Sequence, residues 1–271
     1  MKHALESKNP ESAAPVGYVE VAAEPLHKEI HADSYFRAYQ ANLAPGQATV
    51  YHRHSEDTLY LVIKGGRMST RNFKGCKRGP MLFPRSFPLY KKLWLALQNL
   101  FAGSAYLPTG LSFFMPSRKH PSIHLAAASQ HNLEAVCLMG IELRPAAASR
   151  PAPVREPAPG RVEYDDSSFK LFVCAVAAEA SARIALPGYR LFMVCAKGLL
   201  EIRPETPPQE KNEPDCLTTG AYLSISGDAP LLARNPGDTA SELTLLAVPA
   251  NNYFSTSIPC PSTASPIGQT G

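Results

Sequence analysis

Short runs of β-branched and aromatic residues, bounded by glycine, proline, asparagine or serine, recur along almost the whole chain. Runs of this composition and length are typical of β-strands. In the first half they are YFRAYQANL, TVYHRHS, TLYLVIKGG, LSFFMPS, IHLAAAS and EAVCLMGIEL; in the second they are FKLFVCAV, ARIAL, RLFMVCAKGLLEIR, AYLSIS, PLLARN and ELTLLAV. Short strands at regular spacing predict an all-β fold, an antiparallel sandwich or barrel.

One segment, PRSFPLYKKLWLALQNLFAGS, departs from this strand pattern. Its apolar residues recur at helical spacing, and Gly103 is placed to end a helix. We expect one amphipathic helix over 89–101, inserted between strands, that packs on the β-structure or contacts another subunit. A lid over the mouth of a barrel is the functional alternative. The helical positions are Leu89, Leu93, Ala96, Leu97, Leu100 and Phe101, and Trp94 and Leu95 widen the apolar face.

Proline- and alanine-rich segments divide the chain. Residues 144–160, RPAAASRPAPVREPAPG, cannot form a core and predict a semi-extended linker. Residues 1–17 and 255–271 are small, polar and proline-rich, and we expect them to be disordered tails. Two ordered units remain, at 18–143 and 161–254.

The two units look like copies of each other. LAPG at 43–46 matches ALPG at 185–188, LVIKGG at 61–66 matches MVCAKG at 193–198, and PTGLSFFMP at 108–116 matches TTGAYLSIS at 218–226. The matches occur in the same order, which predicts a duplication. Gly46 and Gly65 are 19 residues apart, but Gly188 and Gly198 only 10, so we expect the second copy to lack nine residues around His52 and His54.

Composition and charge exclude several classes of protein. With 45% hydrophobic and 18% charged residues, the 271-residue chain can bury a substantial core. A formal charge of +4 without a reading motif does not favour a nucleic-acid binder. The six cysteines lack CxxC spacing and mostly lie in apolar runs, which predicts buried free thiols. No apolar run has the roughly 20 residues of a membrane span or resembles a signal peptide, so we expect a cytosolic protein.

The stretch GQATVYHRHSEDTLYLVIKG, Gly46 to Gly65, holds the candidate chemistry. Side chains of a strand alternate between its faces, so those of His52, His54, Glu56 and Thr58 can point to one side. Neutral imidazoles that converge in a barrel interior suit Fe, Zn, Cu or Ni. The alternative is a polar stripe on an exposed strand. All eight histidines lie at or before position 131, so a histidine site in the second half is excluded.

These features together resemble the cupin superfamily, the small RmlC-like β-barrels, over residues 18–253 as a bicupin with the helical insertion in its first barrel. The family's first motif, G-x5-H-x-H-x3,4-E-x6-G, is matched by Gly46, His52, His54 and Gly65, with Thr58 at the acidic position. Its second motif, G-x5-P-x-G-x2-H-x3-N, is matched by Gly110 and Pro116. Arg118 replaces its glycine, His120 comes one residue early and His124 three residues late.

The resemblance implies a metal shell of His52, His54 and His124, with open positions for substrate and dioxygen. His124 lies at the start of the run IHLAAAS, as its second residue, where cupins place their last ligand histidine, and His120, in a loop before Pro121, is the alternate. Glu56 and Thr58 remain alternates for the missing acid. The implied cofactor is a divalent metal, Fe(II) in preference to Zn, Cu or Ni. The remaining histidines of the interpreted segments, His27, His31 and His131, are expected to be solvated.

The function that this resemblance implies is an Fe(II) dioxygenase, an oxidoreductase acting on a small phenolic substrate. The layout is similar to small fungal bicupins of polyketide-toxin pathways such as that of patulin, in which a gentisyl-type phenol is oxidised in mycotoxin biosynthesis. One alternative is a non-catalytic bicupin that binds a small molecule. Another is a sugar-phosphate isomerase-like protein, because the second half resembles the C-terminal cupin of type I mannose-6-phosphate isomerases.

The expected partners are a small-molecule substrate and dioxygen, and no nucleic acid. Cupin barrels commonly pair through edge strands, so a homodimer is a further expectation. Basic residues beside an apolar helix can mark a membrane surface, but a solvated rim is the more frequent arrangement, and membrane contact is not expected. The basic residues are Arg67, Arg71, Lys74, Lys77, Arg78, Lys91 and Lys92.

Overall fold

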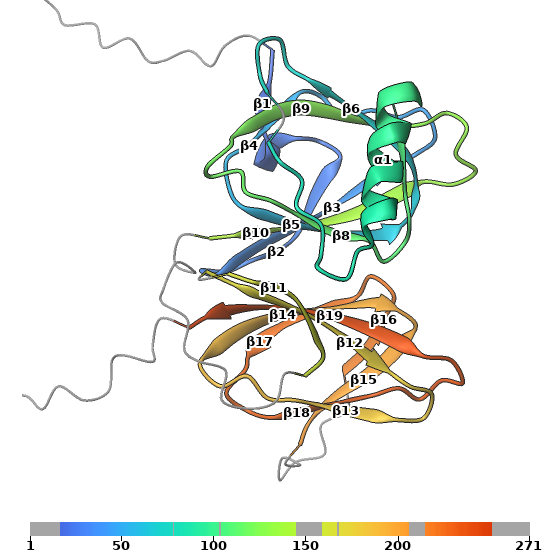
Figure 1. Cartoon of the computed structure of the whole chain (residues 1–271). Helices are drawn as coiled ribbons and strands as arrows, with labels where there is room; N and C mark the ends of the chain where they lie inside the picture. Colours follow the sequence, from blue (N-terminus) through green and yellow to red (C-terminus); the bar gives the residue numbers. More distant parts are fainter. Residues whose placement is uncertain are drawn as a thin grey trace, which may run out of the picture.

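The computed structural model describes residues 17–77, 79–102, 104–144, 159–166, 168–205 and 215–250 (Figure 1). The C-terminal tail, nearly all of the N-terminal tail and most of the predicted linker lie outside these residues, as does Gly103. Within them the regular secondary structure is almost entirely β-strand, with one α-helix and one 3₁₀ turn. The predicted all-β class is confirmed.

The first half forms two five-stranded sheets, with strand orders β1-β4-β9-β6-β7 and β2-β3-β10-β5-β8. Alternating apolar side chains of both sheets meet in one core that includes Tyr39, Val62 and Phe113. The elements are β1 (Val19–Glu20), η1 (Val21–Ala23), β2 (His27–Ala32), β3 (Phe36–Leu43), β4 (His52–His54), β5 (Thr58–Lys64), β6 (Gly66–Asn72), α1 (Leu89–Ala102), β7 (Ala105–Leu107), β8 (Ser112–Met115), β9 (Ser122–Ala128) and β10 (Val136–Leu143).

The second half repeats this arrangement, with strand orders β11-β12-β19-β14-β17 and β13-β18-β15-β16. Strand by strand these orders match β2-β3-β10-β5-β8 and β4-β9-β6-β7 of the first half, so the predicted duplication is confirmed. The elements are β11 (Arg161–Asp165), β12 (Lys170–Val176), β13 (Ser181–Ile184), β14 (Tyr189–Lys197), β15 (Leu199–Pro204), β16 (Asp215–Thr218), β17 (Tyr222–Ser226), β18 (Leu231–Arg234) and β19 (Ser241–Pro249).

Two of the three predicted sequence matches occupy equivalent places. The amide of Gly65 donates to Thr109 Oγ1 at 2.9 Å, and that of Gly198 donates to Thr219 Oγ1 at 3.0 Å. Each threonine precedes a glycine with positive φ, 80° at Gly110 and 85° at its counterpart in the second half. Because a glycine adopts this conformation without steric cost, the same turn recurs in both halves.

The third match, of Gly46 with Gly188, is wrong. Gly46 lies in the turn after β3, where the amide of Gln47 donates to Ala44 O. In the second half the corresponding turn follows β12, where Ala180 N donates to the carbonyl oxygen of residue 177, and the ALPG segment comes only after β13.

The stretch from Gln47, in the turn after β3, to Gly65 has the same length as the stretch from Ala180, in the turn after β12, to Gly198. The expectation that the second copy lacks nine residues is therefore also wrong. A match of four residues is too short to align the two halves, whereas the pairing of strands across the sheet does align them.

Helix α1 is inserted between β6 and β7, as predicted, and it ends within a residue of the expected position. Its first turn follows Pro88, whose carbonyl oxygen accepts from Lys91 N and Lys92 N. Proline is favoured at a helix start because its missing amide has no intrahelical partner there. No helix in the described part of the chain is long and apolar enough to cross a membrane.

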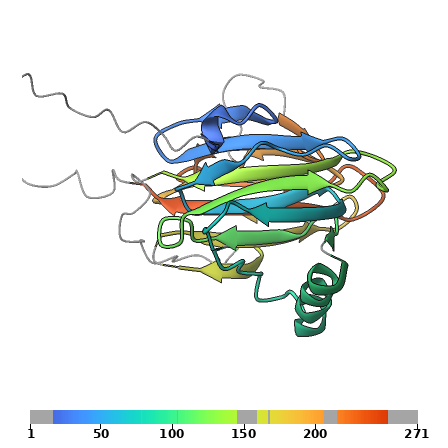
Figure 2. The same ribbon diagram turned by 90° about the horizontal axis from the view of Figure 1, so that it is seen from above.

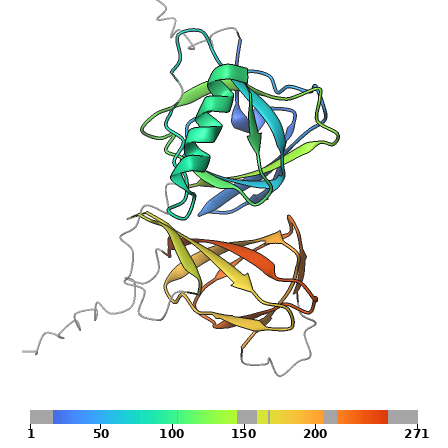
Figure 3. The ribbon, with the colours of Figure 1, turned by 45° about the vertical axis from the view of Figure 1, so that its right-hand side comes forward.

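The two halves pack through one sheet of each, and Figure 3 shows them side by side with α1 on the outside of the first half. Their shared core contains Phe36 and Ile141 from the first half and Phe192 and Leu246 from the second, all nearly or fully inaccessible. The ring of Phe192 lies edge-on to that of Phe36 at 5.5 Å and stacks on Tyr222 at 5.1 Å. This shared core joins one sheet of the first half to one sheet of the second.

The cysteines only partly follow the sequence prediction. All five described cysteines are free thiols, and Cys174 and Cys195 are buried. Burial raises the pKa of Cys195 to about 11, so this thiol is unreactive at neutral pH. Cys216 is exposed, because β16 forms the edge of its sheet.

Candidate metal centre

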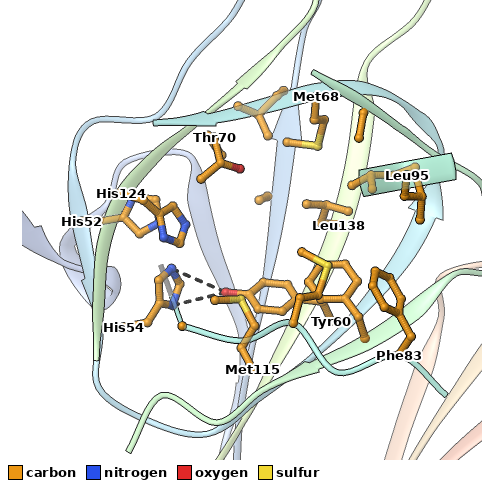
Figure 4. Close-up of a pocket in the computed structure, with 18 of the residues that line it drawn as sticks. His52, His54, Tyr60, Met68, Thr70, Phe83, Leu95, Met115, His124 and Leu138 are labelled. Atoms are coloured by element: carbon orange, nitrogen blue, oxygen red, sulfur yellow. Dashed lines mark hydrogen bonds between the residues drawn. The ribbon is translucent and has the colours of Figure 1, made fainter. Parts of the chain in front are cut away.

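The pairing of β4 with β9 brings three histidines together. His52 and His54 are two residues apart on β4, so their side chains share a face. His124 lies directly opposite His52 in the antiparallel pair, and His54 lies opposite Ser122. The three histidines are 1%, 1% and 8% exposed. Figure 4 shows their rings converging on one wall of the cavity.

The geometry of this group suits one metal ion. The nearest ring nitrogens of His52, His54 and His124 all lie within 4.8 Å of one another, and the ring centroids are 4.8 to 4.9 Å apart. A metal–nitrogen bond is about 2.1 Å, so small rotations of the rings let one ion reach all three. Among the described residues no carboxylate belongs to the group.

Hydrogen bonding and burial keep His52 and His54 in the form that binds metals. His52 Nδ1 donates to the backbone oxygen of Val50 at 2.9 Å, which leaves Nε2 as the free acceptor. Metal-bound histidines commonly have such a partner on their other nitrogen. Burial lowers the pKa of His52, and burial together with the neighbouring histidines holds the pKa of His54 well below its usual value. Both rings are therefore neutral at physiological pH.

A pair of tyrosines adjoins His54. The hydroxyl of Tyr60 lies 3.2 Å from His54 Nδ1 and 2.9 Å from the hydroxyl of Tyr39. Burial raises the pKa of both phenols, so both stay protonated. The hydroxyl of Tyr60 therefore contacts the His54 ring and is itself held by Tyr39. Nothing in the sequence marks either tyrosine, because they come from strands β3 and β5 and meet only in the folded sheet.

His27 lies beside the group, so the expectation that it is solvated is wrong. Its side chain is 6% exposed, its ring stacks on Tyr39 at 4.7 Å and it lies edge-on to His52 at 4.7 Å. Burial and the nearby His52 lower the pKa of His27 to about 3. Its Nδ1 is buried without a hydrogen-bond partner among the described residues, 3.8 Å from a carboxylate oxygen of Glu24. His27 belongs to no sequence motif that would have identified it.

The alternate candidates lie elsewhere. The carboxylate of Glu56 accepts from Arg118 Nε at 2.8 Å. Thr58 is buried, and its hydroxyl donates to the backbone oxygen of Glu56 at 2.8 Å. His120 and His131 are exposed in loops, as expected. His31 is partly buried and lies 3.0 Å from an oxygen of Asp33, between the two halves rather than in open solvent.

The three histidines form one end of a cavity of about 310 Å³. Its other walls are almost entirely apolar, and polar groups are confined to His27, Tyr60, Thr70 and Lys92. The apolar lining includes Met68, Met81, Phe83, Leu95, Phe113, Met115 and Leu138. A small, mainly apolar molecule that carries a polar group at the histidine end fits this arrangement.

No protein-family model and no curated protein matches the sequence. Among solved structures, the chain is similar to the bacterial pirin YhhW from Escherichia coli in complex with nickel(II), with a TM-score of 0.50, 14% identity, and coverage of 83% of this chain and 90% of that one. It is also similar to a cupin 2 conserved barrel protein from Leptotrichia buccalis (TM-score 0.44, 11% identity, coverage 81% and 86%) and to procruciferin, an 11S globulin from Brassica napus (0.48, 10%, 80% and 77%). At such identities the likeness concerns the fold alone.

The duplicated two-sheet architecture is the one that the motifs predicted. The chain has a bicupin fold. In this bicupin the positions that match the histidines are apolar in the second unit: β13 and β18 take the places of β4 and β9, and the cross-strand pair of Ile184 and Leu231 stands where the first unit has His52 and His124. Both residues are buried, so the second unit has a dry core where the first has the histidine group.

Proposed function

We propose that this bicupin is a metal-dependent dioxygenase whose first unit holds one Fe(II) ion and oxidises a small phenolic substrate. One observation carries the proposal: three buried imidazoles converge at one end of a largely apolar cavity. The ion would be held by Nε2 of His52 and by one ring nitrogen each of His54 and His124. Three ligands leave coordination positions open for a substrate, as catalytic metal sites require.

The ion would supply a Lewis acid at which substrate and dioxygen bind together. The residues of the chain do the rest. The methionines and phenylalanines of the wall exclude water from the reacting groups. Tyr60 stays protonated and holds the ring of His54, and the backbone oxygen of Val50 holds that of His52. The cavity is thereby preorganised without a carboxylate ligand.

The chemistry of the donor set restricts the metal. Neutral imidazole suits Fe, Zn, Cu and Ni, and a site without oxygen ligands does not favour Mg²⁺ or Ca²⁺. The similar structure of YhhW was solved with nickel(II). We propose Fe(II) because iron sites of three histidines without a carboxylate occur among the cupins, which this chain resembles. Direct metal analysis distinguishes Fe from Zn, Cu and Ni.

The cavity lining supports a phenol as the substrate. An aromatic ring would contact Phe113, Met115 and Leu138, while its hydroxyl groups would face the histidines and Tyr60. A sugar phosphate needs several polar partners, whereas Lys92 is the only cationic side chain of this lining. The resemblance to bicupins of polyketide-toxin pathways makes gentisyl-type phenols the first compounds to test, with mycotoxin biosynthesis as the proposed setting.

Metal content tests the site. Protein purified without oxygen should contain about one equivalent of iron per chain, measured by inductively coupled plasma mass spectrometry. The double variant His52→Ala/His54→Ala should lose the metal but keep its far-ultraviolet circular dichroism, because both side chains face a cavity. His131→Ala, an exposed histidine in a loop, is the matched control and should retain the metal. A full metal complement in the double variant would refute the site.

Oxygen consumption tests the activity separately. The iron-loaded protein should consume oxygen in the presence of gentisyl-type phenols and hydroquinones, and the double variant should not. Bound iron with phenol binding but no oxygen uptake across the panel would contradict the dioxygenase and leave a small-molecule-binding bicupin.

A further inference from the structure

Helix α1 presents an apolar stripe to solvent. Half of the exposed large apolar side chains in the described part of the chain lie on this one helix, with exposures from 42% to 80%. They are Leu89, Tyr90, Leu93, Trp94 and Leu97. Single exposed apolar residues need no explanation, but a contiguous group marks a contact surface.

The stripe is continuous along the helix. Leu89, Leu93 and Leu97 follow one another at four-residue spacing, and Tyr90 and Trp94 form the adjacent row. Leu95 points the opposite way, is buried and lines the cavity. Figure 2 shows α1 projecting beyond the stacked sheets, and the side chains of the outer stripe are exposed.

Positive charge surrounds the stripe. At 100° per residue, Lys91 lies along one edge of the stripe and Lys92, which also lines the cavity, along the other. Between Asp57 and Glu134 the sequence contains 11 lysines and arginines and no aspartate or glutamate. Among the described residues, only Lys64 and Arg118 of this segment form ion pairs, each with an acid that lies just outside it. The segment that contains the helix therefore carries a net positive charge, most of which is not ion-paired among the described residues.

This charge decides what can cover the stripe. A second copy docked on the same face would oppose lysine to lysine, with no acidic residue in the segment to separate them. A negatively charged surface is complementary instead. Leucine and tryptophan flanked by lysines suit the boundary between acyl chains and anionic headgroups, where the aromatic ring is amphipathic and the lysine ammonium meets phosphate.

We propose that α1 docks this protein on anionic membranes, with Leu93, Trp94 and Leu97 at the acyl boundary and the two lysines at the headgroups. The sequence alone favoured a solvated rim; the exposure of the entire stripe, together with the missing acids, is what changes that expectation. The inference concerns the outer face of α1 and does not depend on whether the cavity is catalytic. Docking is peripheral, because the helix lies along the surface and does not span it.

Trp94 allows a direct test, since it is the only tryptophan of the chain and is 53% exposed. The full-length protein is mixed with vesicles of phosphatidylcholine and phosphatidylserine in equal amounts, or of phosphatidylcholine alone. We expect co-sedimentation and a blue shift of the fluorescence only with phosphatidylserine. Raising the salt concentration should release the protein, because surface charge is screened.

Variants assign the contact to the stripe. Leu93→Ser/Leu97→Ser should abolish binding, whereas Leu133→Ser, at a leucine that is 99% exposed outside the helix, should bind like the original protein. Lys91→Gln/Lys92→Gln should weaken binding about fivefold per lysine at low salt. Equal thermal melting of all four proteins shows that they are folded.

Three results would overturn the proposal. The first is no binding to phosphatidylserine vesicles, the result expected if an acidic protein covers the stripe. The second is equal binding by the leucine variant. The third is a blue shift that grows with protein concentration without vesicles, which would assign the stripe to a second copy.

Discussion

The hydroxyl of Tyr60 joins the histidine group to the core, and its removal gives the most specific prediction. Tyr60→Phe deletes one oxygen atom and leaves the packing of the ring on Phe113 unchanged. The fully buried hydroxyl of Tyr39 then loses its partner at 2.9 Å, and His54 loses a contact at 3.2 Å.

The magnitude follows from these two losses. A buried hydroxyl without a partner costs about 1–3 kcal/mol in the free energy of unfolding. For a chain of this size each kcal/mol lowers the melting temperature by about 2–4 °C. Loss of a partner that orients a ligand histidine typically lowers metal affinity about 10- to 100-fold. Tyr60→Phe should therefore both melt earlier and bind metal more weakly.

Tyr39→Phe separates the two effects. It removes the other hydroxyl of the pair but leaves Tyr60 in contact with His54, so it should lower the melting temperature and keep the metal affinity. The double variant should be less destabilised than the sum of the single ones, because no hydroxyl is then left unpaired. The assays are differential scanning calorimetry of the metal-free protein and competitive metal titration. Equal metal affinities of the two single variants would refute the positioning role of Tyr60.

Two further predictions concern stability. Since burial lowers the pKa of His27, His52 and His54 below the unfolded value of 6.5, their contribution to the free energy of unfolding is complete above pH 6.5 and decreases toward about pH 3. Melting temperatures of the metal-free protein should fall between pH 7 and pH 4 and fall less in His27→Gln; equal slopes would contradict this. Phe192→Ala, in the core between the halves, should cost about 3–5 kcal/mol in urea unfolding. The same substitution at Phe172, buried within the second half alone, should leave the unfolding of the first half unchanged; parallel loss in both halves would show that they are not independent.

Local patterns in the sequence were sufficient for several parts of the structure. The strands follow from runs of β-forming residues, and the shared face of His52 and His54 follows from the two-residue period of a strand. The helical spacing after Pro88 identified α1. His124, unlike His120, stands on a strand that pairs with β4, and this pairing places it beside His52.

Other parts depended on which strands pair. The sequence match of Gly46 with Gly188 was wrong because a short turn motif carries no register. His27, Tyr39 and Tyr60 come from β2, β3 and β5, and only sheet packing places them around His54.

Helix α1 shows most clearly which features follow from the local sequence and which depend on tertiary packing. The sequence by itself determined that α1 is a helix with apolar residues on much of its circumference, since helical spacing is a local property. Only the tertiary structure decided that Leu95 faces the cavity while Leu93 and Trp94 face solvent, because burial depends on which surface of the helix the sheets cover.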